Sequence, residues 1–527
     1  MVLIRTCFIL VFFLVVSIVG CGESKEPVAN ILALVDSLEQ KLEWVNYRLT
    51  EEQWEYYRSG ESDSLSFYNE LYLYLISGSD LYKFASNSNN ISDRIDKQRL
   101  QILVAETLPD RIESRLSLVA FKDSLRNIID SFKVDFQGEA QSLTEVKDIY
   151  DNSRSRSQRE LGCRAWYAVG ENLSPGITKL FKSRNEAAAK LGYDNYWELV
   201  ASQFSQNGID ILQFIKAVDS LTQGANSRFL DGARTSQGVN ELELWDITYA
   251  HSQIDQHGDT FFPDDSQYPF VRRGLVSVGF NLERLPVYYD KANGINNEFD
   301  VEIFAVRPPH DIRLLTDTRN GFAGTRSLLG LTGAALYSAY IAQERPLYNY
   351  AADPTWQIAM QEIIAAMACD SSWLNDVVNM PLGFISQFRK AKLEKETFEV
   401  RVMLANISFV HEAHVNPDQD LNQLYWVLFQ KYTGLPRHED IIIWSTVPEF
   451  ITDPMIPIRQ LLGKSIAAQS INYMTSYFGP LINNHNTSSF LVQNYFRFGS
   501  RYAWSELLQR GTGEKLSPVH LKKFLES

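Results

Sequence analysis

Apolar residues recur at intervals of three and four along most of the chain, with charged residues between them. The stretch ILALVDSLEQKLEWVNYRLTEEQWEYY, which begins at Ile31, shows this clearly. That spacing places the apolar side chains on one face of an amphipathic helix. The same pattern predicts further helices over residues 100–108, 112–132, 186–204, 210–221, 322–342, 356–367, 398–414, 421–432 and 458–477.

Strand-like sequence is confined to one short region. Residues 285–289 and 301–315 carry β-branched and aromatic residues, interrupted by prolines, and this composition favours strands at the edge of a sheet. We therefore expect a mainly α fold with a small β-hairpin or sheet patch beside its centre.

The N-terminus carries a targeting signal. Arg5 precedes an apolar run that ends at Gly20, which is short for a membrane-spanning helix and typical of a signal peptide. The run closes on Ile18-Val19-Gly20-Cys21, which resembles the lipobox of bacterial lipoproteins. We expect residues 1–20 to be removed, Cys21 to be lipidated and residues 21–27 to form a tether; an uncleaved anchor helix is the alternative.

Either alternative places the protein in the bacterial cell envelope, attached to a membrane and facing the periplasm or the exterior. Gly22 stands where some bacteria use aspartate to retain lipoproteins in the inner membrane, which favours the outer membrane. After processing, Cys163 and Cys369 remain, and the sequence leaves open whether they pair.

Length and charge indicate the number of domains and the kind of partner. The 527 residues contain no Pro/Gly/Ser-rich linker and no repeat of 20–50 residues, so we expect one domain over residues 28–527. The formal charge of −14 is spread along the chain without a basic stripe. This distribution argues against nucleic-acid binding.

Several segments, in order, resemble the M2 family of zinc peptidases, the angiotensin-converting-enzyme type. They are RNEAAAKLGYDNYWEL at 184–199, FFPDDSQYPFVRRGLVSVGFNLERLPVYYD at 261–290, NPDQDLNQLYWVLFQKYTGLP at 416–436, and the region from Thr452 to Gly463. In the first, Gly192 is expected to end one helix and Asn195 to begin the next. The resemblance implies a large helical domain of two intergrown lobes with a central cleft, centred on about residues 300–370.

The resemblance also implies where zinc would be bound. Residues 320–341, NGFAGTRSLLGLTGAALYSAYI, stand where the family has its HExxH helix, whose two histidines bind zinc and whose glutamate activates water. The aligned positions here are Gly330, Leu331 and Ala334. Glu362 falls at or near the position of the third ligand, and Ala366 replaces its acidic neighbour.

Donors for the oxyanion are absent from the segment that should supply them. Met455, Ile456 and Ile458 occupy positions where the family has tyrosines. We therefore predict a catalytically inactive homologue of a dipeptidyl carboxypeptidase, without zinc, that binds a peptide or an envelope protein. Its cleft is expected to include His310, Arg326, Trp356 and Glu362.

An active metallopeptidase with a rearranged metal centre is the alternative. It would combine Glu362 with His310 or with His411 and His414, although HEAH at 411–414 is more typical of a solvated helix end. Gly330 and Gly333 need a structural reason, because each glycine in a helix interior lowers the stability by roughly 0.5–1 kcal/mol relative to alanine. We expect them to permit close helix packing across a narrowed zinc pocket.

Overall fold

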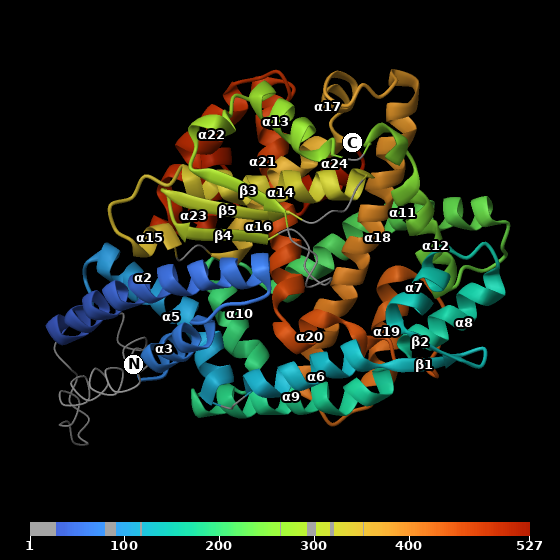
Figure 1. Ribbon diagram of the computed structural model, residues 1–527, viewed down its shortest axis with the longest axis horizontal. Helices are drawn as coiled ribbons and strands as arrows, with labels where there is room; N and C mark the ends of the chain where they lie inside the picture. The colour runs from blue at the N-terminus through green and yellow to red at the C-terminus, as the bar shows by residue number, and fades with distance from the viewer. Residues whose placement is uncertain are drawn as a thin grey trace.

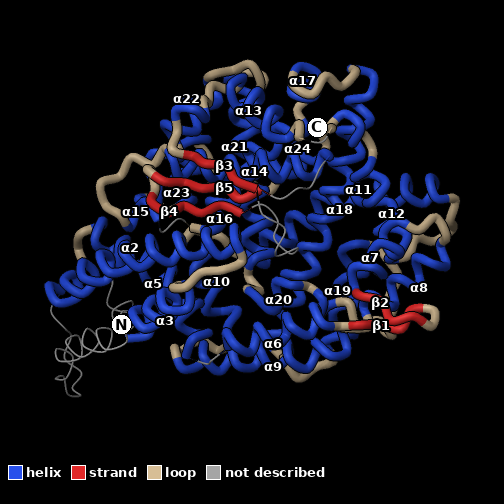
Figure 2. The backbone as a smooth tube through the Cα atoms, viewed as in Figure 1, coloured by secondary structure: helices blue, strands red, loops and turns tan. Residues whose placement is uncertain are grey.

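The computed structural model describes residues 28–78, 91–115, 118–263, 265–291, 302–316, 321–350 and 353–527. The predicted signal peptide, lipobox and tether therefore lie outside the described residues. Within the described part of the chain, no helix has both the length and the apolar character needed to cross a membrane. The fold is mainly helical with two small sheets, which confirms the expected fold class (Figures 1 and 2).

The N-terminal helices form a layer with an apolar cluster of its own. α2 (Val28–Ser59), α3 (Leu65–Gly78) and α5 (Arg94–Arg115) lie together at one end of the molecule (Figure 1). Ile31, Val35, Ile76 and Leu100 belong to this cluster and are almost completely buried. The amphipathic pattern that predicted the first helix is therefore confirmed, and its apolar face packs against α3 and α5.

The next region contains the helices predicted over 186–204 and 210–221, and it adds a hairpin and further helices that the sequence pattern did not reveal. Its elements are α6 (Leu118–Ser131), β1 (Lys133–Phe136), β2 (Glu139–Ser142), α7 (Leu143–Asn152), α8 (Arg156–Tyr167), α9 (Gly170–Lys190), α10 (Tyr196–Gln206), α11 (Ile211–Gln237) and α12 (Leu244–Gln256). The helix predicted over 112–132 corresponds to the end of α5 and to α6, and residues 116 and 117 between them lie outside the described residues.

The predicted break between α9 and α10 is confirmed. Gly192 adopts φ +88°, a left-handed conformation that glycine tolerates without a steric penalty. Asn195 caps α10, since its side-chain oxygen accepts a hydrogen bond from the Glu198 N–H at 3.0 Å. The continuous helix predicted over 186–204 is thus interrupted where Gly192 and Asn195 indicated.

The central sheet is sandwiched between helices. After η2 (Asp259–Phe261), α13 (Gln267–Ser277) and η3 (Leu282–Arg284), the strands are β3 (Val287–Lys291), β4 (Glu302–Arg307) and β5 (Asp311–Thr316). Their order is β3-β5-β4, with β3 parallel and β4 antiparallel to β5. Ile312 and Leu314 face α14 (Gly321–Ala339), while Leu315 packs with Trp54 of α2. The alternation of side chains along β5 fixes this arrangement.

The C-terminal half supplies the longest described helix, α18 (Leu382–Val415). Its elements are α15 (Leu347–Tyr350), α16 (Pro354–Ala365), η4 (Ala366–Cys369), α17 (Ser371–Asp376), α18 (Leu382–Val415), α19 (Leu421–Thr433), η5 (Trp444–Thr446), α20 (Pro448–Thr452), α21 (Ile456–Phe478), α22 (Asn486–Asn494), η6 (Phe496–Arg501), α23 (Trp504–Thr512) and α24 (Val519–Leu525). Each helix predicted in this half is present, although α18 begins 16 residues before the predicted start at 398.

Helix α16 lies between α14 and α21, and glycines set how closely these helices approach. A Cβ added to Gly333 would stand 2.6 Å from the Met360 carbonyl oxygen, and one added to Gly463 of α21 would stand 2.6 Å from Ile358 Cγ2. Gly330 is less tightly packed, with Ala365 Cβ at 3.5 Å. The predicted close approach of the mid-chain helix to a neighbour is therefore confirmed at Gly333.

Replacing these two glycines of α14 by alanine should have opposite effects. Gly333→Ala is expected to destabilise the protein by about 1–3 kcal/mol, because the new methyl group meets backbone that cannot move aside. Gly330→Ala has room for its methyl group and should gain up to about 1 kcal/mol of helix propensity. Urea unfolding of both variants checks this, and equal effects would contradict the packing described.

Candidate functional site

The positions aligned with HExxH lie in the packed interior. Gly330 and Ala334 are buried, and Gly330 faces Gln361 and Ala365 of α16. Leu331, at the position of the general base, packs instead into the apolar cluster between α14 and the sheet, beside Val287. Two imidazoles on this face would collide with α16, so the space for the zinc ligands is filled by helix–helix contact.

Glu362 is held in a cluster of four charged side chains from four helices. Arg326 of α14 donates to Glu362 Oε2 at 2.9 Å, and Lys464 Nζ of α21 lies 3.0 Å from Glu362 Oε1. Glu396 of α18 completes the cluster, 2.7 Å from Lys464 Nζ and 3.5 Å from Arg326 Nη2. Two positive and two negative charges alternate, so the cluster, here called the four-charge cluster, is neutral as a whole.

The pairing controls the protonation of its members. Burial alone would raise the pKa of Glu396, but Lys464 and Arg326 outweigh it and lower that pKa to about 2. Burial would lower the pKa of Lys464, yet Glu362 and Glu396 raise it to about 12. The same carboxylates raise the pKa of Arg326 against the effect of burial. All three groups are therefore charged at neutral pH.

The residues around Glu362 do not fit a catalytic zinc, which requires three protein ligands. Both carboxylate oxygens of Glu362 are already engaged by cations, and Gly330 and Ala334 offer no donor atom. Among the residues that the structure describes, no group of three or more His, Cys, Asp and Glu side chains is arranged to hold a metal ion.

The histidines considered for a rearranged centre are not brought to Glu362. His310 is exposed in the turn between β4 and β5. His411 and His414 lie near the end of α18, 15 and 18 residues beyond Glu396, which at 1.5 Å per residue places them more than about 20 Å from the four-charge cluster along the helix.

The expectation that 411–414 is a solvated helix end is wrong for His414. That side chain is 1% exposed, and its Nδ1 lies 2.8 Å from Asn185 Oδ1. Its ring packs against Phe181 and Tyr196, and burial lowers its pKa well below the usual value. The residue is therefore part of the core between α9, α10 and α18.

The remaining predicted residues are also placed in the interior. Met455 and Ile458, at positions expected to provide oxyanion donors, are 1% and 2% exposed, while Ile456 is half-buried. Cys163 and Cys369 are buried and free, so they do not form a disulfide.

A cleft of about 740 Å³ opens between α5 and the central helices. Its walls come from α5, the end of α10, the start of α16 and residues 499–507. Of the four side chains expected in a cleft, Trp356 lines this one, whereas His310, Arg326 and Glu362 do not. The cleft and the four-charge cluster are therefore separate features, which the sequence-based interpretation had merged.

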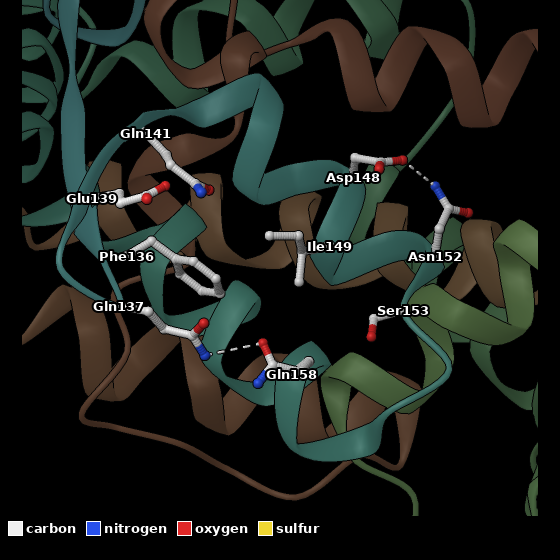
Figure 3. A pocket seen from close by; sticks show the side chains of 9 residues that line it. All are labelled: Phe136, Gln137, Glu139, Gln141, Asp148, Ile149, Asn152, Ser153 and Gln158. Atoms are coloured by element: carbon white, nitrogen blue, oxygen red, sulfur yellow. Dashed lines mark hydrogen bonds between the residues drawn. The ribbon is translucent and has the colours of Figure 1, made fainter.

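A second hollow of about 560 Å³ lies at the β1-β2 hairpin. Figure 3 shows Gln137 donating to Gln158 and Asn152 donating to Asp148 across it. Its lining is mostly amides and hydroxyls, with the carboxylates of Glu139 and Asp148 and no histidine. Four of these side chains pair with one another, whereas Gln141 Oε1 is buried without a hydrogen bond, and the lining presents no nucleophile paired with a histidine base.

Two members of the four-charge cluster, Glu396 and Lys464, were missed by sequence reasoning. Glu396 sits in the charged run KAKLEKETFE of α18, which resembles a solvated face. Lys464 did carry a signal, because it and Arg459 are the only charged residues of the otherwise apolar and neutral α21. An isolated lysine in such a helix requires a buried partner.

Comparison of the sequence with models of protein families and with curated proteins gives no match. The resemblance to M2 peptidases thus rests on the segments quoted above.

The four-charge cluster should be a large contributor to stability. Lys464→Met leaves Glu396 buried beside one remaining cation, and we expect a loss of about 3 kcal/mol, as for other buried pairs that lose one partner. Arg126→Met is the matched control, because its pair with Asp123 is exposed and should cost less than about 1 kcal/mol. Equal losses in urea unfolding would contradict this assignment.

The same cluster predicts a pH dependence. The pKa of Glu396 is lowered on folding from its usual 4.5 to about 2, so its contribution is present above about pH 4.5 and is lost as the pH falls toward 2. Glu396→Gln should therefore be less stable than the parent protein at neutral pH, with a difference that shrinks below pH 4.5. Unfolding curves between pH 2 and 7 measure it; a constant difference would contradict the assigned cause.

Proposed function

We propose that this protein is a catalytically inactive relative of the M2 zinc peptidases, anchored by lipid at Cys21 in the bacterial envelope, that binds a peptide or protein partner. The observation that carries the proposal is the occupation of both Glu362 carboxylate oxygens by Arg326 and Lys464. A glutamate neutralised by two fixed cations is a poor ligand for a third cation, and the aligned histidine positions have no donors.

The packing of α14 against α16 supports the same proposal. Hydrolysis by the family mechanism needs a metal-bound water, a general base and donors for the oxyanion. Leu331 replaces the base and contacts the sheet, while Met455 and Ile458 are enclosed in the core. A retained scaffold with a cleft of about 740 Å³ favours binding as the remaining role.

Metal content and peptide hydrolysis test this proposal together. Purified protein, dialysed and then offered zinc, is expected to retain no stoichiometric metal by elemental analysis. It is also expected to release no dipeptides from peptide substrates that an active M2 peptidase cleaves in parallel. Stoichiometric zinc together with hydrolysis that a chelator abolishes would overturn the proposal.

Lipid anchoring is tested separately at Cys21. The parent protein should incorporate labelled palmitate and sediment with membranes, whereas Cys21→Ser should incorporate none because no thiol remains to be acylated. Cys7→Ser is the matched control, since Cys7 lies within the predicted signal peptide. Labelling of Cys21→Ser at the level of the parent would show that the lipobox interpretation is wrong.

A further inference from the structure

The cleft beside α5 contains two carboxylates that form no salt bridge with the described residues. Asp110 lies near the end of α5, and Asp353 caps the start of α16 on the facing wall. Tyr72 donates to Asp110 at 3.0 Å, and the Thr355 N–H donates to Asp353 at 2.8 Å. Neither carboxylate forms a salt bridge with any described residue, and both side chains are open to solvent in the cleft. Arg459 attracts Asp353, and Lys122 attracts Asp110, from a greater distance.

The arginine side chains that line the cleft form no salt bridge with Asp110 or Asp353 and have other partners among the described residues. Arg459 is paired with Asp453, and Arg94 donates to Glu506 at 2.5 Å. Lys97, the third basic residue of the lining, also has an interaction of its own. The cleft therefore contains four carboxylates and three cations, and the two unpaired carboxylates lie on opposite walls.

The surroundings favour a cation that also has an apolar part. Trp356 and Phe204 line the cleft, as does Tyr350, and aromatic faces attract cations and cover methylene groups. Tyr337 also lines it; its hydroxyl makes no hydrogen bond although the side chain is 1% exposed. Asp353 lies close enough to raise the pKa of Tyr337 together with burial. A phenol oxygen beside a carboxylate can accept a hydrogen bond from an ammonium group.

The protonation of the two carboxyl groups agrees with this arrangement. Burial raises the pKa of Asp353, and burial also raises the pKa of Asp110 although Tyr72 acts in the opposite direction. A bound cation would remove that unfavourable effect. Both carboxylates remain open to solvent in the cleft, and neither is held in a salt bridge with a described residue.

We propose that the cleft between α5 and α16 binds a ligand carrying alkylammonium groups, with Asp110 and Asp353 as the two points of charge recognition. The alkyl part lies against the aromatic side chains between them. Free diamines or polyamines and the lysine side chains of a peptide share this chemistry. The inference gives a ligand class to the binding function proposed above and rests on that proposal for its biological role only.

Calorimetric titration of the full chain in detergent tests the site. The probes are 1,5-diaminopentane, spermidine and a trilysine peptide, with 1,5-pentanediol as the uncharged control. We expect one amine ligand per chain and no binding of the diol. Tighter binding of the free amines would identify them as the source, and tighter binding of trilysine would identify peptide side chains.

Two charge-removing variants make the test specific. Asp353→Asn keeps the helix cap, because asparagine also caps helices, and Asp110→Asn keeps an acceptor for Tyr72. Each should weaken binding at least tenfold, whereas Asp130→Asn, on the exposed side of α6, should leave it unchanged. Thermal melting checks that each variant is folded. If Asp353→Asn does not fold, Asp110→Asn alone still tests the site.

Absence of amine binding, or equal binding by parent and both cleft variants, would overturn the inference. Zinc-dependent hydrolysis would overturn the proposed loss of catalysis but would leave charge recognition in the cleft intact, because the four-charge cluster lies elsewhere. The two failures are therefore distinguishable.

Discussion

The pairing of Arg326 and Lys464 with Glu362 and Glu396 is the interaction on which the interior of this protein depends. It joins α14, α16, α18 and α21 at one point. Charges at such depth are tolerated when each has an opposite neighbour in good geometry, and losing any one leaves another uncompensated. A zinc ion would bring two positive charges to Glu362; here two side chains bring the same charge. A glutamate at the position of a metal ligand is therefore stable without a metal.

Close packing of α14 on α16 complements this charge balance. Gly333 allows the backbone of α16 to lie within 2.6 Å of where a Cβ would be, and this distance leaves no layer in which imidazoles could stand. The four-charge cluster joins the same two helices through the ion pair between Arg326 of α14 and Glu362 of α16. Dispersion contacts on one side and ion pairs on the other therefore hold α16 in place.

Helical periodicity predicted most of the long elements, because burial of one face imposes the spacing that the sequence shows. It missed the β1-β2 hairpin, whose two strands of four residues each are too short for an alternating pattern. The candidate site was predicted only in part. Glu362 and Arg326 were identified through resemblance, but Glu396 and Lys464 come from helices distant in sequence, and no local pattern reveals which charges meet.

The contrast between the four-charge cluster and the cleft decides where a ligand can act. Inside the four-charge cluster every charge has an oppositely charged partner. An incoming ion would have to break an existing pair and also lose its own hydration. In the cleft, Asp110 and Asp353 are exposed and form no salt bridge with a described residue, so a ligand can reach them without breaking an existing pair. A cation placed there gains attraction that the folded protein leaves unused. The proposed binding of a cation is therefore assigned to the α5 wall, even though the resemblance directs attention to α14.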